Sequence, residues 1–317
     1  MKYLIILPDK PYYLWQMLVQ ITNFREVGIE EDAIFIVAYT GAPSPTLMRI
    51  VDDKDVKSRI VVYNDNRINS FYPSSVRLFL MTKFMEENED IRKGTIFYMD
   101  SDVVFTKKPN FDHLLQDDSW YISGTKDVTH YMDSIYIRSK GEDVFELMCD
   151  IVCIPRNKVI QNDDKCGGVQ YIIKNAPVDF WRKAYFDSEA LFQQVTKLSN
   201  KKLNDSKLRG DDPVYHPLQI WCADMWAMLW NAWLFGVDIK PDDAMTFCWA
   251  GWDVSKWNEL TIFHNAGITI HDGINFNKME FQTSPFKKSI GVAPTSASYK
   301  YLQLIRRTEM KFPQLIW

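Results

Sequence analysis

The stretch from Gly94 to Phe105 reads Gly-Thr-Ile-Phe-Tyr-Met-Asp-Ser-Asp-Val-Val-Phe, an apolar run interrupted by two carboxylates. A continuous apolar run of this kind predicts a strand over residues 95–99 that is buried on both faces, as strands of parallel sheets are. The run stops at Asp100 and Asp102 and resumes over residues 103–105. In open α/β sheets ligands bind at the carboxyl ends of strands, so this stretch predicts both a parallel sheet and a binding site.

Asp100 and Asp102 have the spacing of a metal-binding pair. Alternation in an extended chain sends both side chains to one side, where their oxygens can bind one hard cation. We expect Mn²⁺ or Mg²⁺ here, with its remaining coordination positions on phosphate groups. A solvated Asp-Ser-Asp turn is the alternative, and it is the commoner explanation for an isolated Asp-x-Asp.

The composition of the 317-residue chain is that of an ordinary globular protein, with 46% hydrophobic and 25% charged residues. The net charge of −4 argues against a generally basic nucleic-acid-binding protein. The five cysteines include no C-x-x-C, which predicts reduced thiols and neither a disulfide framework nor a zinc site. We find no signal peptide and no stretch with the ~20 apolar residues of a membrane span, so we expect a cytoplasmic protein without membrane contact.

Strands are predicted to alternate with helices in the first third of the chain. Apolar runs predict strands over residues 3–7, 33–39, 59–63 and 95–99. Helices are predicted over residues 12–27, over 46–52, and from a cap at Ser74 or Ser75 to about residue 89. This alternation is typical of βαβ units with a parallel sheet, so the expected fold class is α/β.

The carboxyl ends of these strands should meet at one edge of the sheet. Besides the two aspartates, this edge would carry Pro8, Tyr39, Asp65 and Ser101, which we expect to contact a bound nucleotide. Neither a G-x-G-x-x-G nor a Walker loop is present. The phosphates of a nucleotide would therefore depend on the metal and on a cationic side chain.

Two charged residues lie in apolar helical stretches. Arg77 is surrounded by apolar residues and must find an anionic acceptor, either a ligand phosphate or a carboxylate of the protein. Asp224 lies in residues 216–236, which are apolar on every side, contain four tryptophans and predict a buried helix. A buried carboxylate must be paired, metal-bound or reactive, so Asp224 is a candidate catalytic residue, with a structural hydrogen bond as the alternative.

Three further segments give weaker indications. Residues 200–213 are polar and predict a surface excursion or a mobile loop. Trp249, Trp252 and Trp257 lie in a loop-like stretch, where they either stack on a sugar or base or belong to the core. Residues 298–311 predict a basic helix that either serves a phosphate-bearing acceptor or faces solvent.

Several segments, taken in order, resemble the retaining glycosyltransferases of the GT-A fold, with the glycogenin-like enzymes as the nearest pattern. These segments are Pro73–Leu80, Thr95–Phe105, Lys108–Phe111, Asp163–Asn175 and Thr261–Gly267. Residues 13–16 and 249–253 are closer to the hydroxyproline O-arabinosyltransferase-like group and to reading frames of large bacteriophages. The sequence departs from the family pattern at two places. Lys165 and Cys166 stand where the family has an Asn and a small residue, and the Lys-Pro-Trp that follows the His264 segment in the glycogenin-like members is absent.

The resemblance implies a GT-A-like, mixed and mostly parallel sheet flanked by helices, with a C-terminal helical extension. It implies a glycosyltransferase domain over residues 1–275, divided into a nucleotide-sugar-binding half over 1–110 and an acceptor half over 111–275. Residues 276–317 would form the extension.

The resemblance also implies a UDP-sugar donor and a metal ion bound by Asp100, Asp102 and His264. For His264 a packed core histidine is the alternative, because Ile262 and Phe263 precede it. Arg77 and Gly168 would contact the donor. Asp224 would face the donor sugar, with retention of configuration at the anomeric carbon.

The acceptor is least defined by the sequence. A hydroxymethylated pyrimidine in phage DNA fits the absence of an anchor and the basic tail, whereas a surface-glycan precursor or a protein hydroxyl is the alternative. A sugar-nucleotide nucleotidyltransferase is a second class, although residues 5–11 lack its glycine-rich signature. A binding module without catalytic activity is the third, and the intact aspartate pair argues against it.

Overall fold

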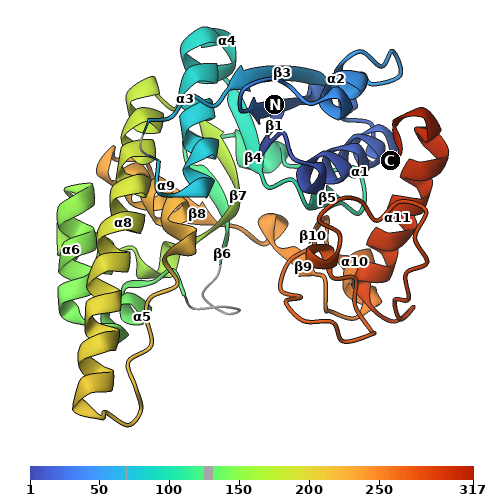
Figure 1. Ribbon diagram of the computed structural model, residues 1–317. Coiled ribbons are helices and arrows are strands. Elements are labelled where there is room, and N and C mark those ends of the chain that lie inside the picture. The colour runs from blue at the N-terminus through green and yellow to red at the C-terminus, as the bar shows by residue number, and fades with distance from the viewer. Residues whose placement is uncertain (69, 125–130) are drawn as a thin grey trace. The chain divides into compact units, whose positions relative to one another are not determined.

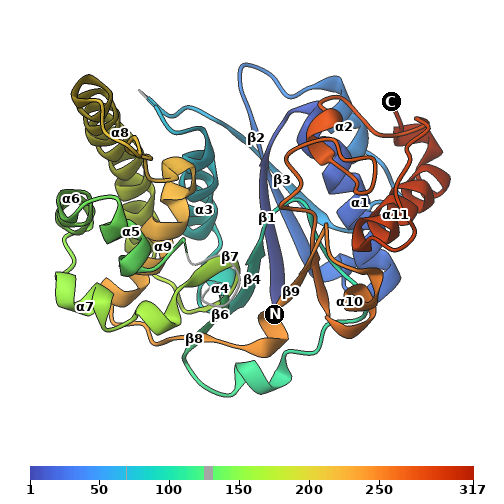
Figure 2. The same cartoon turned by 90° about the horizontal axis from the view of Figure 1, so that it is seen from below.

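The computed structural model describes residues 1–68, 70–124 and 131–317. These residues form two compact units, each built from segments that are distant in the sequence. Unit one comprises residues 1–66, 96–116 and 243–317, and unit two comprises residues 67–95 and 117–242. In unit one the N-terminal helix and the C-terminal helix lie side by side, as Figures 1 and 2 both show.

Unit one contains a parallel sheet with the strand order β3-β2-β1-β4. The strands are β1 (Lys2–Pro8), β2 (Ala33–Tyr39), β3 (Arg59–Asn64) and β4 (Thr95–Met99). The helices that follow β1 and β2 are α1 (Pro11–Val27) and α2 (Pro45–Val51). These elements lie where the hydrophobic runs predict them, because central strands covered on both faces are apolar without interruption.

A second, three-stranded sheet in unit one has the order β5-β10-β9. It consists of β5 (Val103–Phe105), β9 (Phe247–Trp249) and β10 (Ile262–His264). Strand β5 runs antiparallel to β10, which runs parallel to β9. Phe105 of β5 packs edge-on against Phe97 of β4 at 5.5 Å between ring centroids, so the two sheets share one aromatic core.

The C-terminal part of unit one contributes to the same core. It contains α10 (Val254–Glu259) and α11 (Ala297–Lys311), which confirms the predicted C-terminal helix. Trp15 of α1 donates its indole N–H to the carbonyl of Phe281 at 3.0 Å, and the rings of Phe276 and Phe281 stack at 5.1 Å. Trp257 lies in α10 and is 9% exposed, so it belongs to the core rather than to a loop.

Unit two carries the strands β6 (Trp120–Gly124), β7 (Gly167–Lys174) and β8 (Ile239–Pro241), in the order β7-β6-β8. Strand β6 is antiparallel to β7 and parallel to β8. The strands of the two units are thus mixed and mostly parallel, and helices flank them. This confirms the predicted α/β fold class.

The helices of unit two gather around the pair α8 and α9, which pack together and are joined by α3 and α6 (Figure 2). Their bounds are α3 (Val76–Glu87), α4 (Glu89–Arg92), α5 (Ser134–Ser139), α6 (Glu142–Val152), α7 (Arg156–Ile160), α8 (Val178–Arg209) and α9 (Ala223–Leu234). Among the residues that the structure describes, no helix combines the length and apolar character needed to cross a membrane.

Helix α8 corrects the prediction of a loop over residues 200–213. The helix has 32 residues and continues to Arg209, where Gly210 ends it in the left-handed conformation with φ of 73°. Lysine and leucine are good helix formers, so a polar segment of this composition extends a helix as readily as it forms a loop. Lys202 also donates to Asp143 of α6 at 2.7 Å, which anchors the last turns.

One predicted helix start is also wrong. Helix α9 begins at Ala223 and not at residue 216, and Trp221 is 62% exposed in the short 3₁₀ turn η5 (Ile220–Cys222), whereas the other three tryptophans are buried as expected. Helix α3 begins at Val76, after the 3₁₀ turn η2 (Pro73–Ser75), with Ser75 at its N-cap position as predicted, but the side chain of Ser75 forms no capping hydrogen bond. Its hydroxyl bonds a glutamate of α8 instead.

Candidate functional site

Asp100, Ser101 and Asp102 form the turn between β4 and β5, and helix α1 holds this turn in place. The side-chain amide of Gln20 donates to the carbonyls of Asp100 and Val103 at 2.9 and 2.8 Å. Ser101 donates its hydroxyl to Gln16 at 3.2 Å. Both glutamines are buried, so α1 serves as a rigid support for the acidic turn. The sequence analysis missed this function, although two polar residues four apart in a buried helix are a readable sign.

His264, the last residue of β10, lies beside the acidic turn. It pairs with Val103 across the antiparallel strands, and the N–H of Asn265 donates to the carbonyl of Asp102 at 3.0 Å. The Nε2 atom of His264 lies 3.2 Å from Oδ1 of Asp102. The candidate ligand atoms of Asp100, Asp102 and His264 all lie within 4.8 Å of one another. The structure therefore brings together the three residues that the sequence analysis named as metal ligands.

The carboxylate of Asp102 is buried, at 4% exposure, and carries two cationic neighbours. The ammonium of Lys278, from the 3₁₀ turn η7 (Lys278–Glu280), forms an ion pair with Oδ2, while His264 lies at Oδ1. Burial alone would raise the pKa of Asp102, but Lys278 and His264 outweigh it and hold the pKa well below its usual range. Asp102 is therefore an ionised carboxylate at neutral pH.

The donor set fits a divalent cation. Two carboxylates and one imidazole are ligands that suit Mn²⁺ and are compatible with Mg²⁺. Among the described residues, no hydrogen-bond partner is found for the buried Nδ1 atom of His264, whose ring packs on Trp249 at 6.2 Å between centroids. Trp249 lies in β9 and so belongs to the packing around His264 rather than to a loop.

The predicted nucleotide contacts of unit one lie at the carboxyl edge of its sheet. Pro8 and Tyr39 are the last residues of β1 and β2, and Asp65 follows β3 and donates its N–H to the carbonyl of Tyr39 at 2.7 Å. All three are half-buried. The acidic turn follows the neighbouring strand β4, so these residues and Asp100 share one edge.

Arg77 and Asp224 form an ion pair within unit two. The guanidinium of Arg77, in the first turn of α3, bonds Oδ2 of Asp224, and the hydroxyl of Tyr72 lies 2.6 Å from Oδ1. Asp224 is 2% exposed. The carboxylate acceptor that the sequence analysis kept as an alternative for Arg77 is thus present. Burial and the neighbouring Asp224 raise the pKa of Tyr72 far above its usual value, so its hydroxyl stays protonated.

Gly168 lies near the start of β7 in unit two, where an added Cβ atom would press against the ends of two side chains. A Cβ atom there would lie 2.7 Å from Cε of Met225 and 2.9 Å from the hydroxyl of Tyr171. The next residue, Val169, has a φ of 78°. A β-branched residue in the left-handed region costs about 1–3 kcal/mol, and such strain clusters at functional sites.

Comparisons with solved structures found glycosyltransferases among the similar chains. A galactosyltransferase, LgtC, in complex with donor and acceptor sugar analogues matches over 100% of both chains, with 12% identity and a TM-score of 0.47. The bifunctional glycosyltransferase WbbM matches over 85% of this chain and 46% of its own, with 9% identity and a TM-score of 0.46. HddC from Yersinia pseudotuberculosis matches over 39% of this chain and 58% of its own, with 12% identity and a TM-score of 0.27.

No protein-family model and no curated protein matches the sequence. The residues of the site itself therefore carry the functional proposal.

Proposed function

We propose that this protein is a metal-dependent glycosyltransferase that moves a sugar from a UDP-sugar to a hydroxyl group. The observation that carries the proposal is the grouping of Asp100, Asp102 and His264 at the carboxyl end of β4. Two carboxylates and an imidazole whose candidate ligand atoms lie within 4.8 Å of one another suit a divalent cation, and the end of a parallel strand is where α/β proteins bind nucleotides.

Transfer from a nucleotide sugar requires neutralisation of the diphosphate leaving group. Asp100, Asp102 and His264 would hold the Mn²⁺ or Mg²⁺ that supplies this charge as a Lewis acid. Lys278 brings a further positive charge to the same place through its ion pair with Asp102. In our proposal the edge residues Pro8, Tyr39, Asp65 and Ser101 contact the nucleotide part of the donor.

The residues of unit two would serve the sugar and the phosphates. Arg77 bonds Asp224, and 21% of its side chain is exposed; in our proposal its positive charge serves the phosphates of the donor. Asp224 would orient Arg77 and stabilise positive charge at the anomeric carbon, with retention of configuration. The glycine at position 168 would let the backbone approach the sugar closely.

The acceptor that we favour is a hydroxyl of a glycan precursor or of a protein. The basic C-terminal helix, which supported a DNA acceptor in the sequence analysis, is partly neutralised within unit one. Arg307 and Lys311 both bond Glu26, at 3.0 and 2.9 Å, and Arg306 bonds Glu309 at 2.5 Å. These two carboxylates offset half of the four positive charges of the helix, which weakens the case for a phosphate backbone as its partner.

Thermal unfolding with UDP, with and without Mn²⁺, tests the donor site. A ligand at one hundred times its Kd stabilises the native state by about 2.7 kcal/mol, so the unfolding midpoint should rise only when both are present. The rise should vanish in Asp102→Ala and in Asp100→Asn. The second variant keeps the ion pair between Lys278 and Asp102. Asp112→Ala, which removes an exposed carboxylate of unit one, is the matched control and should behave as wild type.

The alternative classes give different results in the same set of assays. The absence of a midpoint shift with any nucleotide would overturn the proposal and leave the acidic turn with a structural role alone. Formation of UTP from UDP-sugar and pyrophosphate would indicate a nucleotidyltransferase. Metal-dependent UDP binding with neither transfer nor hydrolysis of any UDP-sugar would indicate a binding module.

A further inference from the structure

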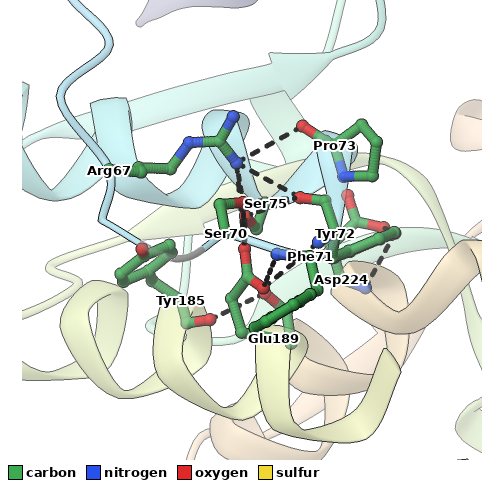
Figure 3. Close-up of polar contacts among 10 residues, drawn as sticks. Arg67, Ser70, Phe71, Tyr72, Pro73, Ser75, Tyr185, Glu189 and Asp224 are labelled. Atoms are coloured by element: carbon green, nitrogen blue, oxygen red, sulfur yellow. Dashed lines mark hydrogen bonds and ion pairs between the residues drawn. The ribbon is translucent and has the colours of Figure 1, made fainter. Parts of the chain in front are cut away.

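The carboxylate of Glu189, in α8 of unit two, accepts several hydrogen bonds from residues 70–75, the segment before α3 (Figure 3). Its Oε2 atom accepts the backbone N–H groups of Phe71 and Tyr72 at 3.0 and 3.2 Å. Its Oε1 atom accepts the hydroxyl of Ser70 at 2.6 Å and that of Ser75. Four donors on one carboxylate use its full accepting capacity, so Glu189 has no lone pair left for a substrate.

The charge of Glu189 is balanced by Arg67. One guanidinium nitrogen of Arg67 lies 3.9 Å from Oε1 of Glu189 and donates to the carbonyl of Tyr72 at 3.2 Å and to Ser75 at 2.6 Å. The two charged side chains are only 10% and 16% exposed. Charge-assisted hydrogen bonds in such a sheltered place are stronger than neutral ones, so this cluster is a rigid anchor.

The residue that this anchor fixes is Tyr72. Its backbone is held by Glu189, and its ring stacks on Phe192, also of α8, at 4.8 Å between centroids and 19° between planes. Its hydroxyl lies 2.6 Å from both Oδ1 of Asp224 and the carbonyl of Trp221, and it accepts the N–H of Asp224 at 3.3 Å. Helix α8 thus determines where the hydroxyl of Tyr72 meets the start of α9.

We propose that Tyr72 and Glu189 are positioning residues for the Arg77–Asp224 pair, an inference that rests on the proposed function of Asp224. Arg77 bonds one oxygen of Asp224 and Tyr72 the other, so the two together fix the rotation of the carboxylate. Without the hydroxyl of Tyr72, the carboxylate of Asp224 turns about its side-chain bond and carries the guanidinium of Arg77 with it. Small displacements of this kind reduce turnover more than ground-state binding.

Tyr72→Phe tests the hydroxyl, because the ring and its stacking on Phe192 are kept. We expect kcat for sugar transfer to fall by about 10- to 100-fold while KM for the UDP-sugar changes by less than about threefold. Tyr215→Phe is the matched control. The backbone N–H of Tyr215 donates to the hydroxyl of Ser206 near the other end of α8, about 25 Å along the helix from Glu189, so loss of the Tyr215 hydroxyl should leave kcat unchanged.

Glu189→Ala and Glu189→Gln test the anchor. Glutamine can still accept the two backbone N–H groups with its oxygen and donate to the serine hydroxyls, which can rotate to accept. We expect Glu189→Gln to keep kcat within about threefold of wild type and Glu189→Ala to lose kcat as Tyr72→Phe does. Amide hydrogen exchange at Phe71 and Tyr72 should accelerate in Glu189→Ala only.

Each outcome decides one part of the inference. Unchanged kcat in Tyr72→Phe, with wild-type transfer demonstrated, overturns the positioning role and leaves the proposed function intact. Wild-type kcat in a folded Glu189→Ala variant, in which the N–H groups of Phe71 and Tyr72 lose their acceptor, overturns the role of Glu189. If the wild type transfers no sugar at all, the proposed function falls and the positioning role falls with it. If Glu189→Ala does not fold, the kcat values of Tyr72→Phe and Glu189→Gln still test the positioning role.

Discussion

Gly167, the residue that opens β7, has almost no space around its Cα atom. A Cβ atom there would lie 2.0 Å from the carbonyl oxygen of Ser123 and 2.8 Å from Cδ1 of Ile122. The first of these is a backbone atom of β6, so it cannot move aside without disturbing the pairing of β6 with β7. The requirement for glycine at this position is therefore one of close strand approach and not of chain flexibility.

Gly167→Ala should destabilise the protein by about 1–3 kcal/mol, because overpacking forces the backbone of one strand away from the other. Urea unfolding at constant pH measures the loss. Gly291→Ala is the control, since a Cβ atom at Gly291 meets nothing within 4 Å and its φ is not in the left-handed region. Equal stability of the two variants would show that β6 and β7 separate more easily than the structure implies.

At the level of single residues, the sequence predicts the acids of the site better than their partners. Asp100 and Asp102 are recognisable because they end a buried strand, and His264 because its segment resembles a known family. Lys278 is 176 positions from Asp102, and its exposed-looking neighbourhood gives no sign of an ion pair. Glu189 is missed for a related reason: a glutamate in a helix is ordinary, and only the fold places two backbone N–H groups against it.

At the scale of elements, the strands are more predictable than the ends of the helices. The four strands of the main sheet in unit one carry uninterrupted apolar runs, which leave little choice of position. The end of α8 and the start of α9 lie in segments that helix propensity does not separate from loops. In α8 the decision is made by the tertiary contact of Lys202 with Asp143 and by the left-handed Gly210.

Gly210→Ala should therefore weaken the end of α8. Alanine in the left-handed conformation costs about 1–2 kcal/mol, and the stiffer unfolded chain offsets part of this, so a net loss of about 1 kcal/mol is expected. No atom lies within 4 Å of the added Cβ, so the change measures backbone conformation alone. The free energy of unfolding of Gly210→Ala is compared with that of Gly291→Ala, and a difference near zero would mean that α8 frays before Gly210 in solution.

For the whole molecule, buried tyrosines link folding stability to alkaline pH. Burial, together with Asp32 and Asp112, raises the pKa of Tyr3 from 10.0 to about 12. A group whose pKa is raised on folding stabilises the native state fully below its unfolded pKa and loses that contribution as pH rises through the folded value. The free energy of unfolding should accordingly fall between pH 10 and about pH 12.

Tyr3→Phe should flatten this fall. The shift in the pKa of Tyr3 corresponds to about 2–3 kcal/mol between pH 10 and pH 12, and phenylalanine removes the titrating group while keeping the packed ring. The measurement is urea unfolding of both proteins at pH 8, 10 and 12, because titration of lysines affects both equally. If the stability of the two proteins falls in parallel over this pH range, ionisation of Tyr3 is not the cause of the fall.

The interleaving of the two units has a consequence for how the chain is made. The ribosome releases the chain from its N-terminus, so all of unit two, which ends at residue 242, is complete before residues 243–317 of unit one appear. Until then β5 lacks β10, its partner strand, and the acidic turn at Asp100 and Asp102 lacks His264 and Lys278. Domains generally fold as units during synthesis, so we expect unit two to fold first on the ribosome and the candidate metal ligands to assemble only after residues 243–317 have been made.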